Sequence, residues 1–131
     1  MYKWVLMLMA VVSGSAAAEW VAITGNERLT IYVDPTTIRR DGDKVKMWSL
    51  FDYRKAQTVK VGGKSLVYLS TKGQDEFDCK EEQKRLIFLT GHSKKMGHGN
   101  TVSTENGPSP WEPVAPASIA EVMWKFACAQ R

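Results

Sequence analysis

The feature that most constrains the fold is a change in hydrophobic period close to Pro116. Before this point, apolar residues recur at every second position in several short stretches, which is the period of a half-buried strand. After it, Ile119, Val122, Met123 and Phe126 follow the spacing of one helix face. This order predicts an α+β domain with a sheet of about six strands and a C-terminal helix packed on it.

The stretches expected to form strands are rich in β-branched and aromatic residues and are bounded by turn residues. They are residues 19–24, 29–33, 44–53, 65–70, 76–80, 85–90 and 101–104. In 44–53, Val45 and Met47 lie on one face, and Trp48 and Leu50 place apolar groups on the other. Both faces of this strand are therefore expected to be covered at its middle.

Turns and loops are expected where glycine, proline and aspartate cluster between these stretches. The expected turns are Asp34–Pro35, followed by a short connector over 36–40, and Asp41–Gly42. The expected loops are 59–64, 91–99 and 106–110, with a break between strands near Lys72–Gly73.

The expected helix spans Ile119 to Ala129. Ser118 and Glu121 have the spacing of a capping box, in which the hydroxyl and the carboxylate satisfy amides of the first turn. Trp124 and Cys128 share the side opposite the main apolar stripe. We therefore expect Trp124 to pack close to any bridge made by Cys128.

The first 18 residues have the pattern of a signal peptide, with Lys3, an apolar run from Trp4 to Val12 and a small-residue site at Ala16–Ala18. A membrane anchor is the alternative, but a span needs about 20 apolar residues and this run is about half as long. Cleavage is expected before Glu19, where no cysteine is available for lipidation. The expected product is a single domain over 19–131, periplasmic or secreted, with no membrane span.

The sequence contains two cysteines, Cys79 and Cys128. An even count in an exported chain predicts an intramolecular disulfide. Two buried free thiols and a bridge between chains remain as alternatives.

The charge is mildly basic, with 18 lysines and arginines against 14 acidic residues. These charges are interspersed, whereas nucleic-acid binders concentrate basic residues on one face. No nucleic-acid partner is expected.

Motifs for catalysis or for cofactors are weak. Residues 62–65 (Gly-Gly-Lys-Ser) resemble the end of a phosphate-binding loop, but Thr58 stands where that loop needs a glycine. His92 and His98 are too few for a zinc site and are expected to be solvated. No nucleophile has an evident base. We expect no catalytic residues, no cofactor and no enzyme activity.

Asp75, Glu76 and Asp78 are candidate calcium ligands, but their oxygens are too few and alternation places them on different faces. A solvated turn and strand face is the expected setting for these three carboxylates. No metal site is predicted.

Basic residues flank the apolar stretch 86–89. Lys84, Arg85, Lys94 and Lys95, with Lys80 nearby, are candidates for a positive rim that binds an acidic partner. The alternative, which we favour, is that these lysines protect a sheet edge from pairing with other chains.

Several segments, in the same order along the chain, resemble the surface-adhesin protein E family. They are Tyr32-Val33-Asp34-Pro35-Thr36-Thr37-Ile38, Val45-Lys46-Met47-Trp48, Asp52-Tyr53, Glu76-Phe77-Asp78-Cys79, Met96-Gly97-His98-Gly99, Trp111 and Cys128. The resemblance covers nearly all of the chain after the leader.

The resemblance implies an antiparallel sheet with a C-terminal helix tied to it through Cys79 and Cys128. It also implies a binding module, because the lipid-anchored protein for which the family is named binds host matrix proteins and can dimerise. The expected partner is a host matrix or envelope protein, and a homodimer is possible within this resemblance. The alternative function is a periplasmic inhibitor or ligand-sequestering protein that uses the loop 91–99.

Overall fold

The structure is a computed structural model that describes residues 18–129. Residues 1–17 of the expected leader (1–18) lie outside the described residues, so its cleavage remains a prediction. The elements are β1 (Val21–Gly25), β2 (Leu29–Asp41), β3 (Lys44–Val61), β4 (Lys64–Asp78), β5 (Gln83–His92), the 3-10 turn η1 (Lys95–Gly97), β6 (Thr101–Asn106), β7 (Glu112–Pro113) and α2 (Ile119–Ala129).

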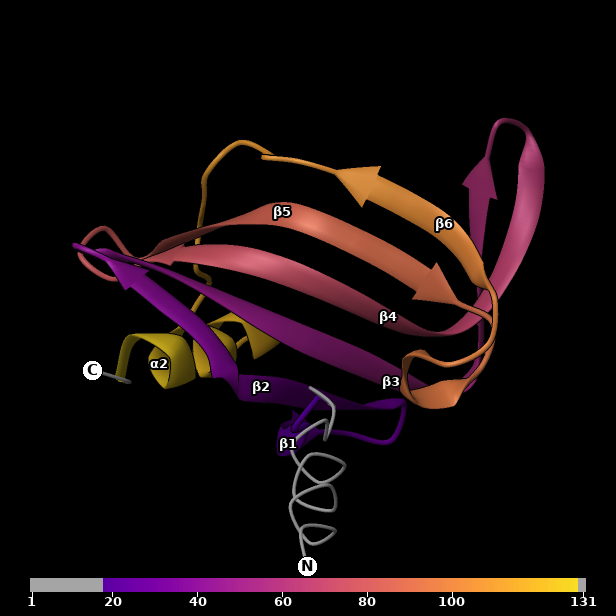
Figure 1. The fold of residues 1–131 in the computed structure, drawn as a ribbon, viewed down its shortest axis with the longest axis horizontal. Helices are drawn as coiled ribbons and strands as arrows, with labels where there is room; N and C mark the ends of the chain where they lie inside the picture. The colour runs from indigo at the N-terminus through magenta and orange to yellow at the C-terminus, as the bar shows by residue number, and fades with distance from the viewer. Residues whose placement is uncertain (1–17, 130–131) are drawn as a thin grey trace, which may run out of the picture.

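The strands form one antiparallel meander in the order β1-β2-β3-β4-β5-β6, and the short β7 pairs with the start of β5. Figure 1 shows a strongly curved sheet with α2 beneath one end and the β3–β4 hairpin turned up at the other. The predicted class, an antiparallel sheet with a C-terminal helix, is confirmed.

The β3–β4 hairpin is longer than the sequence pattern indicates. The expected loop over 59–64 is wrong, because β3 continues to Val61 and only Gly62 and Gly63, both at positive φ, form the turn. The expected break near Lys72–Gly73 is also wrong, since β4 runs without interruption. Glycine at 73 allows close packing, because a Cβ there would lie 3.0 Å from Leu89 Cδ1.

The expected turn at Asp34–Pro35 and connector over 36–40 are parts of β2. The strand absorbs them through a register shift between Asp34 and Arg39 against β3. Asp34 stabilises this irregularity because its Oδ1 accepts hydrogen bonds from the amide and hydroxyl of Thr36, at 3.0 and 2.6 Å. Proline is tolerated here because the shifted ladder does not require its missing donor.

The hydrophobic core lies between α2 and one face of the sheet, which we call the helix face. Alternation along the strands directs the apolar side chains of β2, β3 and β4 to this face. The buried members are Leu29, Ile31, Val33, Val45, Met47, Phe77, Met123 and Ala127. The predicted apolar face of 44–53 is therefore confirmed, with Phe51 and Tyr53 partly buried at its far end.

The opposite face, which we call the outer face, is covered only locally. Leu50 is fully buried there, and a Cβ at Gly97 of η1 would lie 3.2 Å from its Cδ1. Trp48 makes an edge-to-face contact with Phe88, with ring centroids 6.1 Å apart. The expectation that both faces of β3 are covered at mid-strand is confirmed.

The helix begins with the predicted cap, with one difference. The Ser118 hydroxyl accepts the Glu121 amide at 3.1 Å, as expected. The Glu121 carboxylate binds the amide of Ala117, one residue earlier than the cap position itself.

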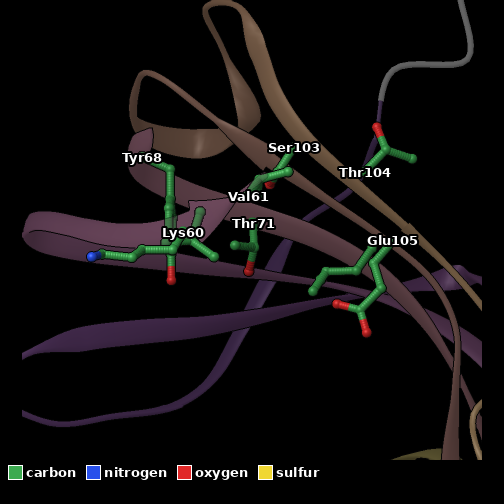
Figure 2. Close-up of a pocket in the computed structure, with 9 residues that line it drawn as sticks. Lys60, Val61, Tyr68, Thr71, Ser103, Thr104 and Glu105 are labelled. Carbon is green, nitrogen blue, oxygen red and sulfur yellow. The ribbon is translucent and has the colours of Figure 1, made fainter. Parts of the chain in front are cut away.

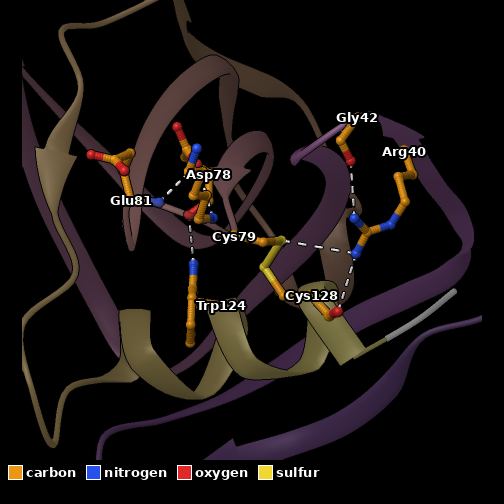
Figure 3. Close-up of a disulfide and its surroundings, with 8 residues drawn as sticks. Arg40, Gly42, Asp78, Cys79, Glu81, Trp124 and Cys128 are labelled. Atoms are coloured by element: carbon orange, nitrogen blue, oxygen red, sulfur yellow. Dashed lines mark hydrogen bonds between the residues drawn. A yellow bond between two sulfur atoms is a disulfide. The ribbon is translucent and has the colours of Figure 1, made fainter.

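Cys79 and Cys128 form a disulfide that joins the end of β4 to the last turn of α2 (Figure 3). Trp124 lies beside it and donates from Nε1 to the Asp78 carbonyl at 2.9 Å, which confirms the predicted position of this side chain. Arg40 adds a second link, donating to the Cys128 carbonyl at 3.1 Å and to the Gly42 carbonyl at 3.0 Å. The positive charge of Arg40 also interacts favourably with the C-terminal end of α2, which is the negative end of the helix dipole.

Within residues 18–129, no helix is long and apolar enough to cross a membrane.

Candidate binding groove beside the C-terminal helix

Helix α2 covers only part of the helix face, and the uncovered part forms a groove. Its lining residues come from β3, β4 and β5 and enclose about 240 Å³. They are Ser49, Phe51, Tyr53, Tyr68, Thr71, Gly73, Asp75, Lys84, Leu86 and Leu89. We call this set the groove.

The floor of the groove is aromatic and aliphatic. Register places Phe51 opposite Thr71 and Gly73 opposite Leu89, so these residues share the helix face. Tyr53 and Tyr68 meet edge-to-face, with ring centroids 5.9 Å apart. The floor is therefore suited to apolar side chains of a partner.

A second hollow, of about 260 Å³, continues the groove under the turned-up hairpin. It shares Tyr68, Thr71 and Leu89 with the groove. In Figure 2, Lys60 of the hairpin and Glu105 of β6 lie on opposite sides of this hollow. The three shared residues place the two hollows side by side on the helix face.

The only acidic residue in the groove is Asp75. It is 7% exposed, and no described residue donates a hydrogen bond to its carboxylate. Lys84 Nζ is 4.0 Å from its Oδ1 and 3.6 Å from Oε1 of Glu112, so one ammonium is shared between two carboxylates. Burial raises the pKa of Asp75, Lys84 lowers it and Glu112 raises it, with burial the largest effect.

The other buried carboxylates are hydrogen-bonded. Glu76, on the outer face, accepts a hydrogen bond from Nε of Arg85 at 2.8 Å and forms an ion pair with its Nη2 at 2.7 Å. The amides of Glu81 and Lys80 bind Asp78 Oδ1, and the Glu81 amide is the main reason that the pKa of Asp78 is lowered. For Asp34, burial raises the pKa, but hydrogen bonds from Thr36 and from the amide of Glu19 outweigh it and lower the pKa.

The expectation that 75–78 is a solvated face is therefore wrong, since Asp75, Glu76 and Asp78 are all less than 9% exposed. The sequence carried one signal of this, because Asp78 directly precedes Cys79, the expected partner in the disulfide. The position of Asp75 opposite Met47 is seen only in the register of β3 and β4. The three do not converge, and no group of metal-ligating side chains occurs within residues 18–129.

The four basic candidates for partner binding fall into two separate pairs. Lys84 and Arg85 lie at the start of β5, whereas Lys94 and Lys95 follow its end. Ten residues of strand span about 30 Å, so the pairs do not form one rim. Their role in binding remains a prediction.

Lys84 and Arg85 already have partners within the chain. Lys84 points to the groove, whereas Arg85 binds Glu76 on the outer face and stacks on Trp111 at 4.5 Å from the ring centroid. Lys95 donates to the Tyr53 carbonyl at 2.9 Å, and Lys94 is exposed.

The two histidines are in different settings. His98 is exposed, as expected, but His92 ends β5 and is 6% exposed, so its predicted solvation is wrong. His92 Nε2 pairs with the Thr90 hydroxyl at 2.8 Å, while Nδ1 is buried without a partner. Burial, with Lys72 and His98 nearby, lowers the pKa of His92.

A third hollow, near the β1–β2 turn, is lined by Glu27, Arg28, Arg54, Lys55 and Gln57. All but Gln57 are exposed. Its lining is polar and charged, without the apolar floor of the groove.

Comparison with known proteins identifies the family. The sequence profile described as "Surface-adhesin protein E" matches residues 20–129. The chain belongs to the surface-adhesin protein E family. No curated protein matches the sequence.

Solved structures of protein E from Haemophilus influenzae have the same fold. Crystal form II is 14% identical, with a TM-score of 0.66 over 88% of this chain and 91% of that one. The protein from non-typeable Haemophilus influenzae is 14% identical, with a TM-score of 0.63 over 88% of this chain and 78% of that one. At this identity the likeness concerns the fold, while the family description is that of a surface adhesin, a binding role.

Proposed function

We propose that the chain is an exported, non-catalytic envelope module that binds another protein through the helix face of its sheet. The observation that carries this proposal is the groove. Helix α2 covers only one half of the helix face, so the aromatic and aliphatic side chains of the other half are not covered by it. These side chains are half-buried along a concave surface, and concave surfaces with an apolar lining are typical binding sites.

The chemistry of the groove supports binding rather than catalysis. No histidine or cysteine is among its lining residues, and its ionisable groups are Asp75, Lys84 and two tyrosines. A groove with an apolar floor and few polar groups is typical of recognition.

Export is the second part of the proposal, with a periplasmic or secreted location after removal of the leader. The disulfide supports it, because structural disulfides persist in oxidising compartments. Fractionation of the native organism provides the test. Recovery of a cut chain that begins at Glu19 is expected, and recovery of the uncut chain in the cytosol would overturn this part.

Binding is tested with the chain from Glu19 onwards, immobilised and exposed to envelope extract and to purified host matrix proteins in parallel. Thr71→Trp fills the groove, since Thr71 lines both hollows. Val67→Trp is the matched control, on the same strand and 54% exposed. We expect capture of a defined partner by the wild type and by Val67→Trp but not by Thr71→Trp. Equal capture by all three proteins would exclude the groove as the binding site.

A periplasmic inhibitor or ligand-sequestering protein is the second candidate. The loop after β5 favours it, because the loop is braced internally, with Ser93 binding Asn100 and Lys94 binding His98 through backbone hydrogen bonds. A braced loop presents the exposed Lys94 side chain to a partner with little loss of conformational freedom on binding. If this loop recognises the partner, the double substitution Lys94→Glu with Lys95→Glu is expected to abolish binding. If the groove recognises the partner, the same double substitution is expected to leave binding unchanged.

A further inference from the structure

We propose that the groove receives an extended segment of the partner protein that carries one lysine or arginine followed by apolar side chains, with the basic group paired to Asp75. This inference rests on the proposed function and specifies the chemistry of its partner.

Asp75 has lost most of its contact with water, and no described residue donates a hydrogen bond to it in return. Moving a carboxylate out of water in this way is costly, so such groups in native proteins call for an explanation. Asp75 is more than nine-tenths buried, and the exposed tenth of its side chain opens on the groove, which it lines. A cation that arrives through the groove would provide the donors that the chain itself lacks.

The charge around Asp75 is complementary to a basic group. Lys84 is the only cation that the structure places against Asp75, and its Nζ lies closer to Glu112 than to Asp75, at 3.6 against 4.0 Å. Two carboxylates with one ammonium leave this end of the groove net negative. A basic group is complementary to it, and an acidic partner would be repelled.

The shape and lining of the groove beyond Asp75 suit an extended chain. The groove follows β4 from Asp75 past Gly73 and Thr71 to Tyr68. At about 3.3 Å per residue, this path is about 23 Å long and accommodates about seven residues of extended chain. Its floor is formed by aromatic and aliphatic side chains, which suits apolar residues that follow the basic one.

A library of random heptapeptides displayed on phage is the probe, selected separately on the wild type and on Asp75→Asn. Asparagine keeps the shape of the side chain and removes its charge. Glu76→Gln is the matched control, a neutralised buried carboxylate one residue away on the outer face. Thr71→Trp blocks the groove itself.

We expect the wild type to enrich peptides with lysine or arginine at one fixed position and apolar residues after it. A synthetic peptide of the enriched sequence is expected to bind Asp75→Asn about tenfold to a hundredfold more weakly, as loss of a charge-assisted hydrogen bond predicts. Binding to Glu76→Gln should be unchanged, and binding to Thr71→Trp should be lost.

Three outcomes would overturn the inference: no enrichment on the wild type, enrichment without a basic position, or equal affinity for Asp75→Asn. Self-association that Thr71→Trp abolishes would also overturn it, since the occupant would then be a second copy of this chain. The proposed function is separable from the inference. Capture of a partner that needs the groove but tolerates Asp75→Asn would refute the inference alone, whereas capture that tolerates Thr71→Trp would refute the groove as well.

Discussion

The two halves of the helix face share β3 and β4 and have similar apolar side chains, but they differ in how deeply these side chains are buried. Under α2, Ile31, Val33 and Met47 are completely buried, and the disulfide and Arg40 fix the helix over them. Beyond α2, Phe51, Tyr53 and Leu89 remain half-buried around the groove. The covered half therefore contributes to the stability of the fold. The open half keeps apolar surface in water, which folding alone does not require.

The largest expected effect tests what holds the covered half together. Replacing Cys79 and Cys128 by serine together should lower the free energy of unfolding by up to about 4 kcal/mol, because the bridge closes a loop with a sequence separation of 49 residues. Denaturation by urea measures the change. A loss below about 1 kcal/mol would mean that packing alone holds α2 in place.

The second prediction compares the halves directly. Met123→Ala removes a side chain that is 2% exposed against the covered half and should destabilise the fold by about 3 kcal/mol. Leu89→Ala, in the open half, should cost about 1 kcal/mol, because its side chain already contacts water in the folded state. Equal losses for the two variants would show that the groove is filled in solution.

The third prediction concerns adjacent carboxylates of β4. Glu76→Gln removes the charge that binds Arg85 and should destabilise the fold by about 1 to 2 kcal/mol, reduced from the value for a fully buried pair because the Arg85 side chain is 28% exposed. Asp75→Asn should not destabilise it, since no described donor loses a hydrogen bond. Thermal unfolding of the two variants side by side provides the measurement, and a larger loss for Asp75→Asn would contradict our description of the groove.

The smallest effect is the pH dependence of Asp75→Asn. Because burial raises the pKa of Asp75 in the folded state, ionisation favours unfolding, so the wild type loses stability from this group as pH rises through the carboxyl range. The stability advantage of the variant should therefore be absent in acid, grow as pH rises and level off towards neutrality. Urea titrations across the acid range measure the difference in free energy of unfolding between the variant and the wild type. A stability advantage of the variant that shrinks with rising pH would contradict a raised pKa for Asp75.

The sequence predicted much of the covered half and little of the open half. The helix, its cap and the position of Trp124 follow from local spacing, and the bridge follows from the even number of cysteines in a chain expected to be exported. The family resemblance supplied the antiparallel arrangement of the sheet. The long β3–β4 hairpin was missed because Gly62 and Gly63 mark a turn without showing how far the ladder extends on either side. Local patterns carry no information on that extent.

The groove was missed for a related reason. Asp75, Tyr68 and Leu89 come together only through the register of three strands, which no single stretch of sequence displays. The burial of His92 was missed because its neighbours in sequence, Gly91 and Ser93, suggest a loop. It is buried because β5 continues to it and pairs it with Ser70.

The disulfide also determines how the chain would respond to mechanical load. When the two ends are pulled apart, tension passes from Cys79 to Cys128 through the sulfur atoms, so β5, β6 and most of α2 carry none of it. At about 3.5 Å per residue, the 49-residue separation withholds about 170 Å of contour length from extension. Only the part of the sheet that precedes Cys79 is free to unravel under force, and reduction would release the remainder.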